Sequence, residues 1–304
     1  MPRFEKWLKG VGGRVRLSVS AQRALQGRLK AVAHYLQRVA DKHVRGAEAV
    51  HQLRVWTRRS AAAVELFREV LPKSKRRWFK RKLKQIRRAA GEVRDCDVLL
   101  ARLAAEPASP AADRLAESVR KRRKAARVPL RELADDLGGS GKLKRKTAKL
   151  LAATRWRGKG PEPRFADWRL ARLAPLRDEF LRLANSRSPA PAALHELRIA
   201  GKRLRYAMEL VAGERGDPLR KWLYGELSDF QDRLGRVCDH IAAAERFREM
   251  LSAATMPTDR DYFQSLVTRE NKRFEQSRRA FFRWWSVKRK RAMRERWEGF
   301  KVGD

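Results

Sequence analysis

This sequence is poor in cysteine, in acidic residues and in long apolar stretches. Its two cysteines, Cys96 and Cys238, form no CxxC pair, so no disulfide framework is implied. No uninterrupted apolar run approaches the roughly 20 residues that a membrane-spanning helix needs. The first residues are charged and lack the continuous apolar segment of a secretory signal. These absences fit a reducing compartment, and we expect a cytoplasmic protein with no transmembrane segment.

The shortage of acidic residues leaves a large positive charge. The 304 residues include 74 Lys and Arg against 35 Asp and Glu, which gives a net charge of +39 and a pI near 11.4. Hydrophobic residues still make up 43% of the chain, which is enough for a core and excludes a disordered basic tail. Such a charge attracts polyanions and accelerates their arrival. Composition alone does not choose among nucleic acid, acidic membrane and polyphosphate.

Glycine and proline are sparse as well, with 18 and 12 residues, and the abundant residue types are good helix formers. Apolar residues recur at spacings of three and four along most of the chain, and no segment alternates with period two. We therefore predict an all-α fold of long antiparallel helices without strands. The length suits two domains, or one domain built of two halves.

The second half of the sequence repeats the first. A shift of 144 residues superimposes the apolar stripes without a gap. The first stripe, Leu29, Val32, Leu36 and Val39, then coincides with Leu173, Leu176, Phe180 and Leu183. A duplicated four-helix unit explains this pattern and predicts two four-helix bundles.

Helix-breaking residues and composition divide the chain into five segments. We expect a flexible basic segment (1–19), a first four-helix repeat (20–137), a basic linker with one short helix (138–165), a second four-helix repeat (166–287) and a basic C-terminal tail (288–304). Ser20 is the expected N-cap of the first helix.

The repeat is sharpest in the second helix of each half, where both copies contain H-x-x-R-x-x-x-[RK]-R. The motif begins at His51 in the first copy and at His195 in the second. A G-x-V-x-D motif follows in both, starting at Gly91 and Gly235, which lie 40 residues after the respective histidines. The constant spacing indicates that the two motifs belong to one structural unit.

A helical period gathers the cations of this motif on one face. Arg54 and Arg58 fall within about 60° of His51, and Trp56 lies on the opposite, apolar face. The second copy has the same stripe, formed by His195, Arg198, Lys202 and Arg205. Each helix therefore presents one face to the core and a row of cations, led by a histidine, on the other.

The third helix of the first half carries another basic row, in which cations recur every three or four residues. Its members are Arg77, Lys80, Lys84, Arg87 and Arg88. A charged row is usually a solvated face, but like charges at these spacings cost about 0.2–0.5 kcal/mol per pair. Almost no acidic residues separate these cations, which favours an anionic partner. If the second and third helices are neighbours, their two rows can flank one groove.

These motifs resemble those of the CHAD family, the conserved histidine α-helical domain. The resemblance rests on the paired histidine helices and on the segments LKQIRRAAGEVRDCDV (83–98) and LSDFQDRLGRVCD (227–239). It implies that residues 20–287 form one domain of two four-helix bundles related by pseudo-two-fold symmetry, with a basic central groove or pore. It also implies binding of inorganic polyphosphate and, for some members, association with polyphosphate granules. Sulfate or phosphate would then mimic the ligand.

The resemblance and the basic row together give the expected polyphosphate-binding residues. They are His51, Arg54, Arg58, Arg59, Arg77, Lys80, Lys84, Arg87, Arg88, Arg94, His195, Arg198, Lys202, Arg203 and Arg205. Asp95 and Asp239 match acidic positions of the family, and we expect them to orient arginines rather than touch the ligand.

The two halves differ at several of these positions. Ala61 stands where the second copy has Arg205. The second copy lacks four cations of the basic row and has Tyr224, Ser228, Gln231 and Asp232 in place of Lys80, Lys84, Arg87 and Arg88. We therefore expect an asymmetric groove whose stronger wall comes from the first half.

The sequence gives no sign of catalysis. Polyphosphate hydrolysis usually needs a metal held by clustered carboxylates, and neither such a cluster nor the E-x-E-x-K signature of a triphosphate-tunnel domain is present. The GGSGKL segment resembles a P-loop only superficially, because Asp136 occupies the position of its first glycine and Leu143 follows the lysine. The five histidines lack zinc-ligand spacing. We expect no enzyme, metal or cofactor.

Two alternatives remain open. Nucleic acid is the second choice of ligand, but base stacking needs exposed aromatics among the cations. Trp56 and Phe67 sit opposite the basic stripe, which leaves Tyr206 as the only aromatic residue beside it. The C-terminal aromatic residues Phe274, Phe281, Trp284 and Trp285 precede a basic run at 288–297. They could lie on acidic lipid, although a place in the core of the eighth helix is the simpler interpretation. Nothing in the sequence indicates the oligomeric state.

Overall fold

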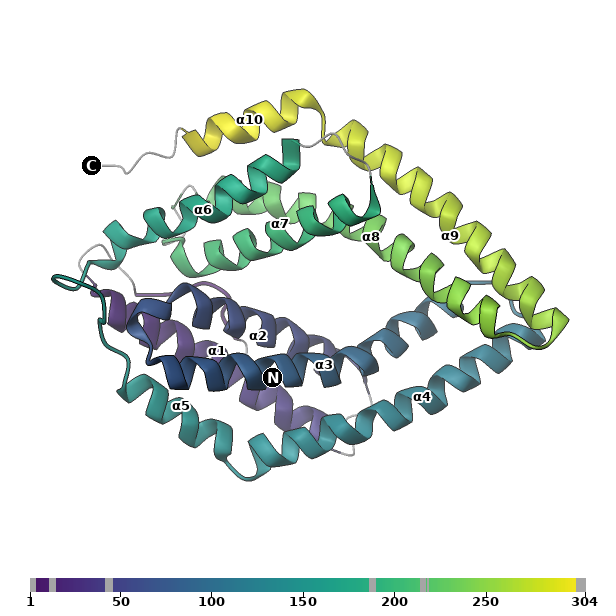
Figure 1. Cartoon of the computed structure of the whole chain (residues 1–304), viewed down its shortest axis with the longest axis horizontal. Coiled ribbons are helices and arrows are strands. Elements are labelled where there is room, and N and C mark those ends of the chain that lie inside the picture. Colours follow the sequence, from purple (N-terminus) through teal and green to yellow (C-terminus); the bar gives the residue numbers. More distant parts are fainter. Residues whose placement is uncertain are drawn as a thin grey trace. The chain divides into compact units, whose positions relative to one another are not determined.

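The computed structural model shows an all-helical chain, as predicted (Figure 1). It describes residues 4–10, 15–41, 46–185, 190–213, 217 and 219–298. Over these ranges the chain forms ten α-helices, a 3₁₀ turn and two π turns, and its single β-bridge joins Arg16 and Arg164. The chain divides into two compact units, a first unit of residues 1–168 and a second unit of residues 169–304.

The first unit contains five helices, namely α1 (Leu17–Ala40), α2 (Ala47–Leu66), α3 (Lys73–Leu103), α4 (Pro110–Ala134) and α5 (Lys142–Ala152). The short η1 turn (Arg68–Val70) lies between α2 and α3, and the η2 turn (Asp135–Gly139) lies between α4 and α5. Helix α2 packs between α1 and α3, whereas α4 contacts both α1 and α3 (Figure 1). This order places the histidine helix directly beside the helix of the basic row.

The apolar stripes form the core of this unit. Val32 and Leu36 of α1 and Ile86 and Val93 of α3 are fully buried. Burying one such side chain contributes about 1.5–3 kcal/mol. The cations between these positions are consequently turned away from the core, which sets the orientation of the basic row.

The beginning of the chain differs from the expectation. Helix α1 begins at Leu17, and Ser20 lies within it, where its hydroxyl donates to the Arg16 carbonyl at 3.3 Å. Trp7 is buried, and the Lys6 carbonyl accepts a hydrogen bond of 2.9 Å from Arg28 on α1. Residues 4–10 of the expected flexible segment therefore pack against the first unit, whereas residues 1–3 and 11–14 lie outside the described part of the chain.

The linker between the repeats contains the predicted short helix. Ser109 caps α4 by accepting a hydrogen bond from the Ala112 N–H at 3.1 Å, and α4 continues past Pro129 to Ala134. Gly141 then precedes α5 with a φ of +67°, a conformation that glycine adopts at little cost. Helix α5 contacts α1 and has Leu150 fully buried. The opposite, basic face of α5 is exposed.

The second unit contains α6 (Phe165–Asn185, which begins in the first unit), α7 (Pro191–Val211), α8 (Tyr224–Ala253), α9 (Pro257–Trp284) and α10 (Val287–Glu298), with the η3 turn (Leu219–Leu223) before α8. Helices α8 and α9 form a long antiparallel pair (Figure 1). Its core is aromatic, because the ring of Phe230 lies 5.1 Å from Phe180, 5.4 Å from Phe281 and 4.7 Å from Trp285. Two of the C-terminal aromatic residues thus belong to the core.

The last segment is not a solvated tail over its described part. Residues 287–298 form α10, and the side chains of Met293 and Trp297 are buried. These two residues are four apart and so share one face of the helix, which contacts η3. Residues 299–304 lie outside the described ranges.

The starts of the two histidine helices match the offset found in the sequence. Helix α2 begins at Ala47 and α7 begins at Pro191, which are 144 residues apart. The internal duplication itself stays a prediction from the sequence. No helix of the described residues is long and apolar enough to cross a membrane.

Candidate anion-binding site

The two sequence motifs of the first half meet where α2 packs against α3. A Cβ atom at Gly91 would lie 2.7 Å from Nη1 of Arg54, well inside ordinary van der Waals contact. The absence of a side chain at Gly91 therefore lets the Arg54 guanidinium lie across α3. Sequence reasoning noticed both motifs but missed this contact, although the constant spacing of 40 residues was a signal for it.

Helices α2 and α3 line an open cavity of about 510 Å³, which we call the α2–α3 cavity. It contains five of the expected binding residues, and its complete lining is Arg54, Arg58, Lys84, Arg87, Arg88, Gly91, Glu92 and Asp95. The three cations from α3 are exposed, whereas the two arginines from α2 are half-buried. The cavity therefore presents guanidinium groups at its base and mobile cations at its rim.

The two arginines at the base of the cavity lie close enough to influence each other. Burial lowers the pKa of the Arg54 guanidinium, Arg58 acts in the same direction, and Asp95 opposes both effects. An arginine nevertheless keeps its charge in proteins. An anion placed beside Arg54 would relieve the repulsion that Arg58, Arg94 and Arg87 exert on it.

His51 lies at the end of the cationic stripe and is half-buried. Burial lowers its pKa, the charge of Arg94 adds to this effect, and Glu48 opposes it. The imidazole is therefore neutral near pH 7. A bound anion would oppose the effect of the Arg94 charge and favour the protonated form of His51.

Besides His51, four expected residues of the first unit lie outside the lining of the cavity. Arg94 acts electrostatically on both His51 and Arg54, and the Arg59 guanidinium lies 4.8 Å from the centre of the Trp56 ring. The remaining two are Lys80, whose ammonium pairs with Glu65 at 2.8 Å, and Arg77, which is exposed on α3. The ion pair reduces the charge that Lys80 can offer a ligand.

In the second unit, the arginine of the motif is paired with the aspartate that follows the glycine. Arg198 donates to Asp239 at 3.2 Å, and a Cβ at Gly235 would lie 3.5 Å from the Arg198 guanidinium. This is an ordinary contact distance, so the packing is looser than at Gly91. In the same cationic stripe, His195 is exposed and Lys202 is half-buried.

The other two arginines of the second motif have acidic partners. Arg203 pairs with Glu179 of α6 at 3.2 Å. Arg205 donates to the Tyr224 hydroxyl at 3.1 Å and lies 3.8 Å from Glu209, which is fully buried. The Arg205 side chain is therefore engaged inside the second unit, which the helical period did not reveal.

Corresponding positions of the two halves make corresponding contacts here. Tyr224 occupies the position of Lys80 and Glu209 that of Glu65 in the repeat. The Tyr224 hydroxyl donates to Glu209 at 2.8 Å, as the Lys80 ammonium does to Glu65. Burial raises the pKa of the Tyr224 phenol, and the charge of Glu209 adds to this effect. The exchange of Lys80 for Tyr224 thus keeps the link between the helices but removes a surface cation.

Gln231 stands where the first half has Arg87. Its side chain is buried and approaches Gly201 of α7 so closely that a Cβ at Gly201 would lie 2.0 Å from the Gln231 amide nitrogen. At this position the second unit therefore has a buried packing residue, whereas the first unit has a cation that lines the α2–α3 cavity. The expected asymmetry, in which the first half carries the stronger basic wall, stays a prediction.

No group of three or more His, Cys, Asp or Glu side chains within the described residues is placed to hold a metal ion. Cys96 and Cys238 are both buried free thiols, and burial raises the pKa of the Cys238 thiol. Both cysteines therefore behave as packing residues.

The comparisons with known proteins agree with the motifs and the helix order. The CHAD domain profile matches residues 23–248, whereas no curated protein matches the chain. The solved structures that are similar to this one include the following two. The crystal structure of the CHAD domain from the plant Ricinus communis has a TM-score of 0.74 and 20% identity, and the match covers 100% of this chain and 99% of that chain. PptA from Streptomyces chartreusis has a TM-score of 0.63 and 17% identity, with coverages of 89% and 99%. Because the profile spans most of the chain and both histidine helices, this protein belongs to the CHAD domain family.

Proposed function

We propose that this protein binds inorganic polyphosphate at the α2–α3 cavity and does not hydrolyse it. One observation carries the proposal, namely that five cations from two helices converge on a single cavity. The family membership supports the same ligand, since CHAD domains in general are consistent with polyphosphate binding.

The chemistry of the cavity suits a chain of phosphates. Arg54, Arg58, Arg87 and Arg88 offer planar guanidinium groups that can bind phosphate oxygens in pairs, and Lys84 offers a mobile point charge. Each charge-assisted hydrogen bond is worth about 1.5–3 kcal/mol. A polyphosphate carries no bases, so its recognition needs only cations and donors along a path.

The stripe of the second unit contributes less to this proposal. His195 is exposed, Lys202 is half-buried and Arg198 pairs with Asp239. Arg203 pairs with Glu179, and Arg205 contacts Tyr224 and Glu209. We assign Asp95 and Asp239 to holding Arg54 and Arg198 in place. Cytoplasmic location and attachment to polyphosphate granules belong to the same proposal.

Nucleic acid is the competing ligand, because its phosphates would satisfy the same cations. Single-strand binders usually add aromatic side chains on which bases stack. The aromatic residues near the two motifs, Trp56, Phe67 and Tyr206, are 4%, 0% and 8% exposed. They belong to the core, and this favours a ligand without bases.

A competition experiment tests the proposal. Labelled long-chain polyphosphate is bound to the full chain and challenged with duplex DNA or RNA at equal phosphate concentration. We expect little displacement, and release of free phosphate should stay at the level without protein. Efficient displacement by nucleic acid would refute the choice of ligand, and phosphate release would refute the absence of hydrolysis.

A pair of variants localises the binding. R54A/R87A removes two cations of the cavity, and K121A/R122A removes two exposed cations of α4 outside it. The first variant should lose at least tenfold in affinity, since about 1.4 kcal/mol corresponds to a factor of ten, and the second should change it much less. Equal losses would show that only the net charge matters.

A further inference from the structure

A second basic surface of the first unit lies around α5, outside the α2–α3 cavity. It borders a separate cavity of about 460 Å³, whose lining is Asp136, Ser140, Lys142, Arg145, Lys146 and Lys149. We call this surface the α5 face. It shares no residue with the α2–α3 cavity, and neither the two motifs nor the basic row of α3 includes any of its residues.

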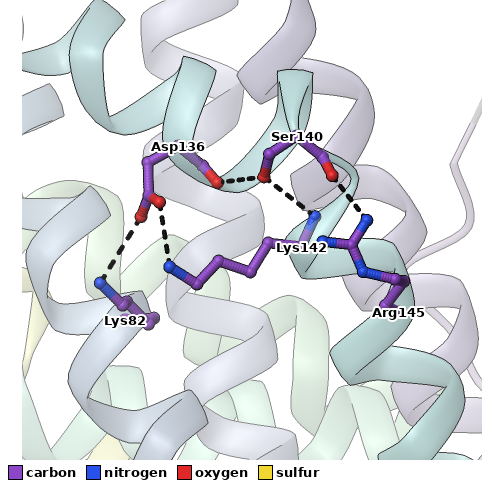
Figure 2. Close-up of polar contacts among 5 residues, drawn as sticks. All are labelled: Lys82, Asp136, Ser140, Lys142 and Arg145. Atoms are coloured by element: carbon purple, nitrogen blue, oxygen red, sulfur yellow. Dashed lines mark hydrogen bonds and ion pairs between the residues drawn. The ribbon is translucent and has the colours of Figure 1, made fainter.

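The turn between α4 and α5 holds part of this face in place. Figure 2 shows Asp136 between two lysines, Lys142 at 3.0 Å and Lys82 of α3 at 3.8 Å. Ser140 lies on the other side of Lys142, where its hydroxyl accepts a hydrogen bond from the Lys142 N–H and its carbonyl accepts one from Arg145 (Figure 2). The N-terminal cations of α5 are thus positioned before any ligand arrives.

The remaining cations of the face extend along the helix. Lys146 and Lys149 are exposed, and the Lys146 ammonium lies 5.8 Å from the centre of the Trp78 ring of α3. Arg145 and Lys146 lie three and four residues after Lys142, and Lys149 lies four and three residues after them, so all four share one side of α5. Such neighbours repel one another, and Asp136 is the single acidic residue in the lining.

The balance of charges identifies the class of ligand. Four cations and one carboxylate give the lining a net charge of +3, which matches a compact, multiply charged anion rather than a single carboxylate. Lysine ammonium groups bind phosphate as mobile point charges, and Arg145 adds a planar fork. The cavity lies within the range of about 300–1,000 Å³ typical of small-ligand sites.

We propose that the α5 face is a second anion site, which binds a short phosphate chain independently of the α2–α3 cavity. Asp136 positions Lys142 and does not bind the ligand. The site does not depend on the histidine helices, and it would exist even if the α2–α3 cavity bound something other than polyphosphate.

Hydrogen–deuterium exchange of the full chain, with and without sodium tripolyphosphate, tests this proposal. We expect slower exchange in residues 136–150 in the wild type, and the same protection in R54A/R87A. Calorimetry should count two tripolyphosphate ions per chain. Protection of α2 and α3 without protection of 136–150 would overturn the second site and leave the proposed function intact, whereas the reverse pattern would overturn the proposed function alone.

Charge-matched variants separate a site from a general attraction. K142Q/R145Q/K149Q should abolish protection of 136–150 and weaken the second binding event by about tenfold or more. K121Q/R122Q/K124Q removes the same charge from exposed positions of α4 and should preserve both events. Equal losses in the two variants would contradict a defined site.

A variant with fewer substitutions controls for a loss of folding in the triple variant. K146Q/K149Q keeps every contact drawn in Figure 2, and it should still weaken the second event. An unchanged second event in this variant would count against the proposal. Stronger protection of 136–150 by duplex DNA than by tripolyphosphate at equal phosphate concentration would replace the proposed ligand with nucleic acid.

Discussion

Replacement of Gly91 by alanine should separate stability from binding. The new Cβ would lie 2.7 Å from Nη1 of Arg54, whereas ordinary contact begins at 3.4 Å. The guanidinium must therefore move by at least about 0.7 Å, which a long side chain can do without moving the backbone. Arg54 then leaves the position from which it lines the α2–α3 cavity.

The two effects of this substitution have opposite signs. Alanine in a helix interior is more favourable than glycine by about 0.8–1 kcal/mol, so the free energy of unfolding should stay constant or rise. The displaced arginine should cost one charge-assisted hydrogen bond to the ligand, about 1.5–3 kcal/mol. This corresponds to an affinity for polyphosphate that is about 10- to 150-fold lower.

Denaturant unfolding and calorimetric titration with polyphosphate measure the two quantities. Gly235→Ala is the matched control, because its Cβ would lie 3.5 Å from the Arg198 guanidinium. It should gain similar helix stability with little change in affinity. In an Arg54→Ala background, Gly91→Ala should cost no further affinity. Additive losses in the double variant, or a Gly91→Ala protein that binds like the wild type, would refute the role of this contact.

Three further predictions concern salt, pH and the second unit. The logarithm of the association constant for polyphosphate should fall linearly with the logarithm of salt concentration as counterions are released, and a flat response would contradict electrostatic binding. Because burial and Arg94 lower the pKa of free His51, a bound polyanion should raise it, so binding should take up protons and tighten as the pH falls toward 6. Calorimetry in buffers of different ionisation enthalpy measures this uptake, which His51→Gln should reduce. Tyr224→Phe removes a donor from the buried Glu209 carboxylate, and denaturant unfolding should show a loss of about 1–3 kcal/mol. It should leave polyphosphate affinity unchanged, and a stability equal to that of the wild type would show that Arg205 alone satisfies this acid.

Most helices could be predicted from the sequence because their signals are local. Apolar spacing indicated the helical segments, and the short helix expected within residues 138–165 is α5. The packing of residues 4–10 could not be predicted, because this short segment has no period and its contacts, such as those of Lys6 with Arg28 and of Phe4 with His34, depend on how it folds back on α1. The same reason explains α10, whose buried Met293 and Trp297 are the only apolar anchors in a basic run.

The candidate site was predictable in its residue types but not in its contacts. A helical period placed Arg205 in the same stripe as Arg198, yet the structure turns it toward Tyr224 and Glu209. The repeat held a clue, since Arg205 and Tyr224 depart together from their counterparts Ala61 and Lys80. Recognising this pair as a contact requires knowing how α7 faces α8, which periodicity within one helix does not contain.

The ion pair between Lys80 and Glu65 has a consequence for long ligands. It places a carboxylate beside the second member of the basic row, and the cations of α3 that line the α2–α3 cavity begin at Lys84. A path of fixed length contacts a fixed number of phosphates at a time. A longer polyphosphate makes no additional contacts, but it has more positions along its length at which it can bind. Its affinity, counted per polyphosphate molecule, should therefore grow in proportion to its length as a statistical factor.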